Sequence, residues 1–427
     1  MISDKKNKID IFLKFLIYSF PVFIILGPFA LNLFSIVFSI YALLNFKKLI
    51  KFNFFNNKIL IFFFSFIFFI FPFQSIGFEN SFIKYISFFR FVLMLFGLII
   101  FFELQKNNFF FFKIYKIYAA FLIIITIDVL IEYNFGSNIM GYTSYYSGRI
   151  ASFTNDELII GYIYCFLALF TLIFFYNKTN YYFFSFISCL IIIISFFIGE
   201  RSNLIKLSLL IISFSFFHFF YLKRLGFKYI ILLTTIIFVF FISLFILSKN
   251  TSQGNKLFFI DNLIISNNDK ISFNFKGRFY ESNHAAHYLT AYKIFLNHPI
   301  FGIGINNFHK ESSKEKYENK KLQKTNIRAS THPHQLYLEI VSEVGLLGLI
   351  YFIFIFFYPV YISIRSFFIY REIFIISHLF LHLYFIFPIL PSGSIFGTNY
   401  GIPFWFNLAI LLYYSKNNVI SNLKNQK

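Results

Sequence analysis

The stretch THPHQLYLEIVSEVGLLG, residues 331–348, joins a long polar segment, 248–335, to an apolar one. Pro333 disfavours a helical backbone at His332 and suits the first turn of a helix. We therefore expect a helix to begin near His334. It would start at the boundary between water and lipid, where an imidazole can exchange protons near neutral pH.

Two carboxylates follow on the same expected helix. Glu339 and Glu343 would lie one turn apart on one face, while His334 and Leu338 would share another. The carboxylates could orient the imidazole or bind hydroxyl groups. In the simpler alternative, the histidine caps a helix and the carboxylates are interfacial polar residues.

The composition excludes a water-soluble globular protein. Hydrophobic residues make up 58% of the chain and charged residues 13%, and the mean hydropathy is +0.70. Apolar runs of about 20 residues recur, which predicts an all-α, polytopic bundle of transmembrane helices. We count about twelve spans, at 10–28, 30–46, 58–73, 82–102, 109–131, 158–176, 181–198, 203–222, 228–247, 336–358, 372–390 and 401–415.

Basic residues orient this bundle. Short connections on one side carry most of the lysines and arginines, and such loops face the cytoplasm. Both termini would then be cytoplasmic. The expected parts are transmembrane helices over 1–247, a long periplasmic loop with short helices over 248–335, and helices with a cytoplasmic tail over 336–427. The net charge of +20 fits loops that face anionic lipid, so we expect no nucleic-acid partner.

Several arginines depart from this distribution. Arg149, Arg201 and Arg278 are expected on the outer side, and Arg90 lies within a span. A guanidinium stays charged and matches phosphate oxygens in a bidentate manner, so these residues are candidates to hold a pyrophosphate at the membrane edge. The alternative is an arginine that reaches the interface or pairs with a carboxylate such as Glu200.

Histidines gather in and beside the outer segment. His284 and His287 would share a helix face, and together with His332 and His334 they could form a zinc site. No HExxH pattern occurs and neither cysteine lies near, so we expect no metal. No GxGxxG or P-loop pattern occurs either, so we expect no nucleotide cofactor.

Two further pairs of residues allow two interpretations each. Asp128 and Glu132, one turn apart near an outer helix end, could be functional or structural. His378 and His382 lie within a span, where hydrogen bonding between helices is favoured over a proton relay. Residues Tyr280–Leu296 are expected to form a helix that lies on the membrane surface.

The spacing of these residues resembles that of a known family. Nine residues separate Gln335 from Gly345, and two separate Gly345 from Gly348. This pattern after His334 resembles the signature of the O-antigen ligase and polymerase superfamily. Segment 297–304 and the Gly-Glu-Arg-Ser run that contains Arg201 also resemble that family.

This resemblance implies a metal-independent, inverting glycosyltransferase of the O-antigen ligase type. The donor would be a glycan on polyprenyl (undecaprenyl) diphosphate, and the acceptor a hydroxyl of lipid A–core on the periplasmic side. His334 would be the general base, and Arg201 and Arg278, with Arg149, would bind the diphosphate. The residues expected to support this site are Gln335, Glu339, Glu343, His332 and Arg90.

Other acceptors would make it a different enzyme. A second lipid-linked glycan would make the protein a polymerase, and a protein side chain would make it an O-oligosaccharyltransferase. A transporter of lipid-linked glycans is a different class that would also show many spans and buried cations. The sequence shows no inverted repeat, and one outer segment carries most of the polar residues, which disfavours the transporter.

Overall fold

The computed structural model describes residues 2–51, 81–105, 108–146, 148–157, 159–176, 181–217, 234, 237–238, 264–267, 270–273, 282–318 and 325–415. Helices dominate this part of the chain, as the sequence predicted. The long helices are α1 (Ile2–Tyr18), α3 (Pro28–Leu44), α7 (Ser81–Gln105), α8 (Asn108–Phe135), α9 (Ile160–Tyr176), α10 (Tyr181–Ile198), α11 (Arg201–Phe216), α16 (Asn283–Asn297), α18 (Leu336–Tyr370), α19 (Ile373–Phe385) and α20 (Thr398–Ser415).

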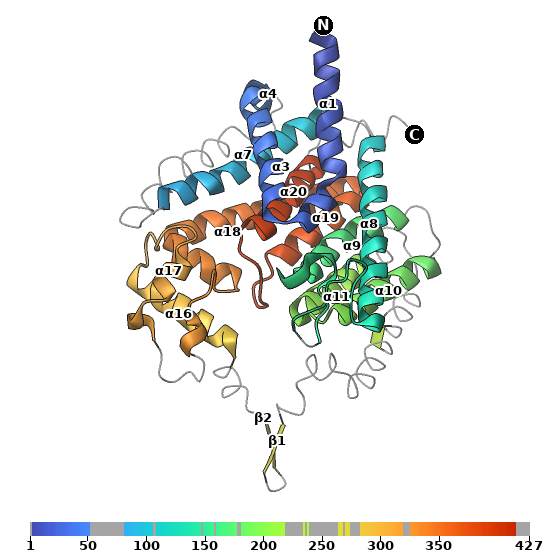
Figure 1. Cartoon of the computed structure of the whole chain (residues 1–427). Coiled ribbons are helices and arrows are strands. Elements are labelled where there is room, and N and C mark those ends of the chain that lie inside the picture. Colours follow the sequence, from blue (N-terminus) through green and yellow to red (C-terminus); the bar gives the residue numbers. More distant parts are fainter. Residues whose placement is uncertain are drawn as a thin grey trace.

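Shorter elements connect these helices. They are α2 (Phe20–Leu26), α4 (Phe46–Lys51), α17 (Phe308–Ser312) and the 3₁₀ turns η2 (Ser152–Glu157), η4 (Glu315–Tyr317) and η5 (Thr325–Arg328). A hairpin pairs β1 (Ile264–Asn267) with β2 (Lys270–Phe273) in antiparallel register. The start of α1 and this hairpin lie at opposite ends of the molecule (Figure 1).

Several helices are suited to crossing a membrane. Those long and apolar enough are α7, the Phe109–Phe135 part of α8, and α18, with a fourth span if α1 and α2 are counted together. The total of about twelve spans stays a prediction. Two expected spans, 58–73 and 228–247, lie outside the described residues apart from 234 and 237–238.

The first expected span, 10–28, is not one straight helix. Its two parts, Lys8–Tyr18 and Phe20–Leu26, are bent by 55°. Pro21 lies in the first turn of α2, and because proline cannot continue a helical hydrogen-bond ladder, a new helix starts there. Gly27 then separates α2 from α3 with a φ of 83°.

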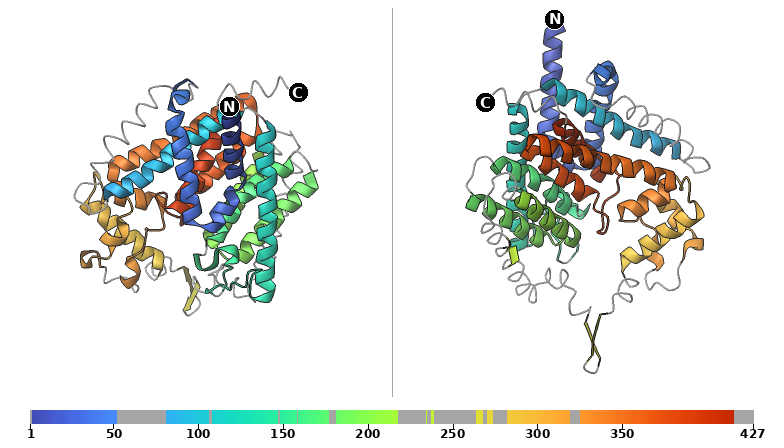
Figure 2. Two further views of the ribbon diagram at one scale, coloured as in Figure 1. Left: turned by 45° about the horizontal axis from the view of Figure 1, so that its top comes forward. Right: turned by 180° about the vertical axis from the view of Figure 1, so that it is seen from behind.

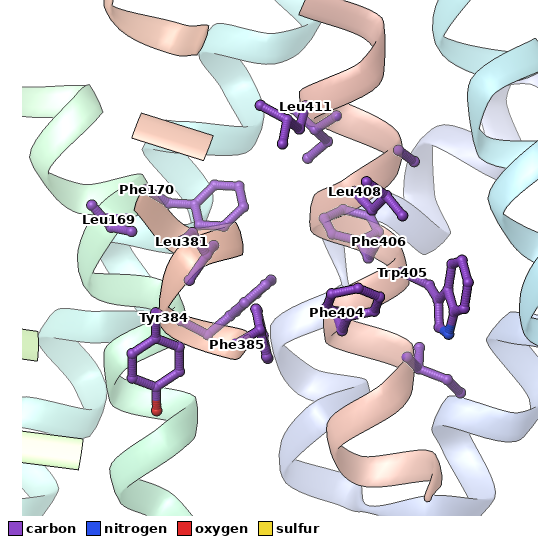
Figure 3. Close-up of a cluster of buried hydrophobic side chains, with 14 of the residues drawn as sticks. Leu169, Phe170, Leu381, Tyr384, Phe385, Phe404, Trp405, Phe406, Leu408 and Leu411 are labelled. Atoms are coloured by element: carbon purple, nitrogen blue, oxygen red, sulfur yellow. The ribbon is translucent and has the colours of Figure 1, made fainter. Parts of the chain in front are cut away.

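Helix α20 forms the centre of the bundle. Every residue from Tyr400 to Ser415 is buried, as expected for a helix that is apolar on all sides. It packs against α3, α7, α18 and α19. Figure 3 shows Phe404 and Phe406 of α20 on the side that faces α9 and α19, whereas Trp405 points to the opposite side, where it packs against Phe88 of α7. In lipid, such close packing takes the place of a hydrophobic driving force between helices.

The histidines of α19 bind other helices. His378 shares hydrogen bonds with the hydroxyl of Tyr115, at 3.1 Å, and with the side-chain oxygen of Asn407, at 2.8 Å. His382 Nε2 lies 2.9 Å from the carbonyl oxygen of Phe356. These contacts confirm the expectation of hydrogen bonding between helices.

The outer segment contributes a lobe of its own. Ala291, Ile294, Ile303, Phe308 and Tyr317 form a small buried cluster within it. This lobe and the group α9–α11 lie on opposite sides of the lower part of the molecule in every view (Figures 1 and 2). The outer lobe also packs against α18 through α16.

Helix α16 packs on one side within the protein, and its expected place on the membrane surface stays a prediction. Its buried positions include Ala285, Ala286, Ala291 and Ile294, which pack within the protein. Tyr292 and Leu296 on the same helix are exposed. Packing against α18 and η5 therefore decides which side of α16 is covered.

Candidate active site

The backbone around His334 differs from the expected helix start. Helix α18 begins at Leu336, and Gln335 is its N-cap, with a side-chain oxygen that accepts a hydrogen bond from the N–H of Leu338 at 2.6 Å. His334 lies before the helix with a φ of 57°. The prediction that it shares a helical face with Leu338 is therefore wrong. Left-handed residues other than glycine carry strain and cluster at functional sites.

Four histidines surround this point. The ring centroid of His334 lies 4.2 Å from that of His332, 5.2 Å from that of His287 and 6.0 Å from that of His284. Its Nε2 shares a hydrogen bond of 3.2 Å with the hydroxyl of Ser330. The expected grouping of these imidazoles is thus present. Among the described residues, no group of three or more His, Cys, Asp or Glu side chains has an arrangement that could hold a metal ion.

The histidine cluster favours uncharged rings. Burial, followed by the neighbouring imidazoles of His332, His287 and His284, lowers the pKa of His334 to about 3. Burial lowers the pKa of His332 to about 4 and also lowers the pKa of His287. At neutral pH the ring of His334 is therefore uncharged and able to accept a proton.

The structure brings Arg149 and Arg201 together. The backbone beside Arg149 is joined to the end of α10, because Ile150 N–H donates to the carbonyl of Ile198 at 3.1 Å. Gly199 permits this approach, since a Cβ there would lie 2.3 Å from the carbonyl oxygen of Gly148. Burial, followed by the charge of Arg149, lowers the pKa of Arg201.

Arg201 is also the first residue of α11. The N-terminus of a helix carries partial positive charge and free N–H groups, which favour an anion. Two guanidinium groups and a helix N-terminus therefore collect at one place. Arg278, the third expected arginine, lies outside the described residues.

Two carboxylates on α8 hold the loop that carries Arg149. Glu132 accepts hydrogen bonds from the N–H groups of Ala151 and Ser152, at 2.9 and 2.6 Å. Asp128 accepts from the Ser152 hydroxyl at 2.6 Å. Of the two interpretations for this pair, the structure supports the structural one.

The arginine pair and the histidine cluster act on each other electrostatically. The charge of Arg149 lowers the pKa of His284, after the larger effects of partial burial and of His287. The ring of His284 in turn lies 6.0 Å from that of His334, so the charge of Arg149 acts on the histidine cluster that contains His334.

The connection between α19 and α20, residues 386–397, lies between the outer lobe and α9–α11 (Figures 1 and 2). The carbonyl of His334 accepts a hydrogen bond from Ser392 N–H at 3.0 Å. Gln335 donates to the carbonyl of Pro388 at 2.6 Å. Glu339 accepts from the hydroxyl of Ser394 and from a backbone N–H of this connection.

Glu343 binds a different loop. Its carboxylate accepts hydrogen bonds from the N–H groups of Asn306, at 2.7 Å, and Phe308, at 3.1 Å. Glu339 and Glu343 are thus bound to backbone and hydroxyl groups of two loops, not to His334. They hold these loops against the start of α18.

The glycine of the signature breaks α18. Gly345 has a φ of 67° and a ψ of −167° inside the helix. At this break, segment 299–304 docks on the helix: Leu346 N–H donates to the carbonyl of Pro299 at 2.8 Å, and Gly304 N–H to that of Glu343 at 2.7 Å. The expected span 336–358 is therefore two helical pieces.

Arg90 is placed apart from these arginines. Its guanidinium donates to the side-chain oxygen of Asn32 at 2.8 Å, and Thr398 donates to the same oxygen at 3.1 Å. Residues that the sequence did not single out as site residues include Ser392 and Lys206. Lys206 is buried, and its signal in the sequence is a lysine within an apolar run.

No curated protein matches the chain. The model of the family described as O-antigen ligase matches residues 157–353. This range includes Arg201, His334 and Gly345 but not Arg149 or Arg90. Residues 157–353, a little less than half of the chain, are thus similar to the O-antigen ligase family, and this similarity points to a membrane protein with a glycosyltransferase-type function.

Proposed function

We propose that the protein transfers a glycan from polyprenyl (undecaprenyl) diphosphate to a hydroxyl of lipid A–core, on the periplasmic side of the bacterial inner membrane. One observation carries this proposal. A pair of arginines at a helix N-terminus acts electrostatically on a cluster of neutral histidines that contains His334.

The arginines suit the diphosphate. Arg201 and Arg149 carry two positive charges at the start of α11, and Arg278 is proposed as a third. Bidentate contacts to phosphate oxygens would bind the donor and stabilise the negative charge that develops as the diphosphate leaves. These cations would perform the role that a metal ion has in many phosphate-dependent enzymes, so the reaction is proposed to need no metal.

His334 suits the other half of the reaction. The acceptor oxygen forms a bond to the anomeric carbon while the bond from that carbon to the diphosphate breaks, which inverts the centre. The diphosphate leaves with the bonding electron pair, and His334 takes the hydroxyl proton. The negative charge of a bound diphosphate would raise the low pKa of the imidazole and so favour this transfer.

The proposal also assigns sides of the membrane. Both termini would be cytoplasmic and segment 248–335 periplasmic. The distribution of basic residues supports this orientation, and the separation of the start of α1 from the hairpin β1–β2 is consistent with it (Figure 1).

Transfer in reconstituted vesicles tests the proposal. The purified protein is supplied with a synthetic glycan on undecaprenyl diphosphate and with lipid A–core. We expect His334→Ala to lower kcat by about 10²–10⁴-fold. Arg201→Ala should raise the KM for the donor as well, and Arg365→Ala, a change of an exposed arginine outside the site, should have no effect.

The vesicle assay and a measurement in cells separate the alternatives. Joining of two lipid-linked glycans without lipid A–core would identify a polymerase. Loss of the donor from the outer leaflet in His334→Ala cells would identify a transporter. Normal transfer by His334→Ala would refute the enzymatic proposal.

A further inference from the structure

Lys206 is a buried cation within the bundle. Its side chain lies on α11 and the residue is 3% exposed. The ammonium donates to the carbonyl oxygen of Pro391 at 2.7 Å and lies 5.5 Å from the ring centroid of Tyr384. Burying a charged group at membrane depth is costly, so such residues usually serve function and have a definite partner. Here the partner is a backbone carbonyl of segment 386–397.

That carbonyl belongs to the residue next to the one that binds His334. Pro391 accepts from Lys206, and the N–H of the following residue, Ser392, donates to the carbonyl of His334 at 3.0 Å. Arg201 lies five positions before Lys206 on the same helix. A short series of bonds therefore leads from Arg201 through α11, Lys206 and two residues of the connection to His334.

The connection is held from the His334 side as well. Gln335 donates to Pro388, and the hydroxyl of Tyr337 donates to the carbonyl of Ile386 at 2.8 Å. Segment 386–397 is thus bound on one side to the start of α18 and on the other to α11. Its position determines how far the imidazole lies from the arginines.

We propose that Lys206 is a positioning residue that sets the distance and orientation between the diphosphate-binding Arg201 and the base His334. This inference rests on the proposed function. In this role the Lys206 ammonium acts through segment 386–397 at Pro391 and contacts neither donor nor acceptor. A base displaced by about 1 Å can lower the rate by 10²-fold, so a clamp of this kind affects turnover more than donor binding.

Kinetics of two Lys206 variants in the vesicle transfer assay test this role. Lys206→Met keeps the length of the side chain but removes the charge and the donor, and Lys206→Arg keeps both. We expect Lys206→Met to lower kcat by about 10–100-fold with the KM for the donor changed less than about 2-fold. Lys206→Arg should recover at least part of that loss. Lys113→Met is the matched control, because this exposed lysine lies 4.9 Å from the ring of Tyr18, away from the site.

Gel filtration and thermal unfolding of each variant separate positioning from folding. If Lys206→Met merely lowers the yield of folded protein while the folded fraction turns over normally, Lys206 has a structural role and the inference is wrong. If the donor KM of Lys206→Met rises by the same factor as its kcat falls, Lys206 is a binding residue, and this result would also overturn the inference. If His334→Ala and Arg201→Ala are both fully active, the proposed function itself has failed. Normal kinetics of Lys206→Met beside inactive His334→Ala would refute the inference alone.

Discussion

Replacement of Gly345 by alanine should detach the outer lobe from α18. Gly345 has a φ of 67° and a ψ of −167°, a conformation that is accessible to glycine and strained for other residues. A Cβ at this position would lie 2.3 Å from the carbonyl oxygen of Ile300 and 2.7 Å from the nitrogen of Gly302. Both contacts are with backbone, so segment 299–304 would have to move.

The expected cost follows from strain and lost hydrogen bonds. The backbone strain costs about 1–3 kcal/mol. Segment 299–304 makes hydrogen bonds to α18 at the N–H groups of Leu346 and Leu347, and at the carbonyls of Ser342 and Glu343. Four lost bonds of about 1 kcal/mol each bring the total to roughly 5–7 kcal/mol. Because α16 leads into this segment, His287 and His284 would shift relative to the base.

Thermal unfolding, limited proteolysis and glycan transfer measure this effect. Gly345→Ala should be cleaved faster within residues 282–318 and should lose most of its transfer activity. Gly27→Ala is the matched control, because Gly27 has a similar backbone, with φ 83° and ψ −158°, and nothing lies within 4 Å of its added Cβ. If the two variants are cleaved alike and transfer alike, the docking of segment 299–304 on the break is not what supports the site.

Three further predictions concern the site and its supports. Because the pKa of His334 is lowered to about 3, the pH profile of kcat/KM should show no inflection near pH 6.5, and an inflection there would contradict this prediction. The unfolding free energy should fall as the pH drops from 6.5 towards 3, because the unfolded chain binds more protons in this range, and pH-dependent melting measures this fall. Gln335→Ala should destabilise the protein by about 1–2 kcal/mol through loss of the α18 cap, and an unchanged melting temperature would argue against that cap. Glu132→Gln should weaken the charge-assisted bonds to the Arg149 loop and raise the KM for the donor, whereas an unchanged KM would remove Arg149 from donor binding.

The start of α18 shows where local rules were insufficient. Proline in the first helical turn is a sound local preference, and it placed the start of the helix near His334. In the structure, the carbonyl of His334 is bound by Ser392 and the side chain of Gln335 takes the capping position. Gln335 also donates to the carbonyl of Pro388, so two contacts with segment 386–397, more than 50 positions away in the sequence, hold the residues before the helix, which starts two residues later than expected.

The carboxylates illustrate a second limit. Glu339 and Glu343 were expected one turn apart on α18, and both lie in that helix before its break. Their partners, however, are Ser394 and Asn306, on two different loops. Helical periodicity predicts which face a side chain occupies, but not which segment packs against it.

The sequence by itself determined that this is a helical membrane protein, and it singled out His334, Arg201 and Gly345. Hydropathy and motif spacing run along the chain, so they are readable without coordinates. Only the tertiary structure decided that Arg149 lies beside Arg201 and that Lys206 holds the segment bound to His334. Hydrogen bonds and charge effects act over a few ångströms in space, and Lys206 and Pro391 are 185 positions apart in the sequence. No local pattern encodes such a contact.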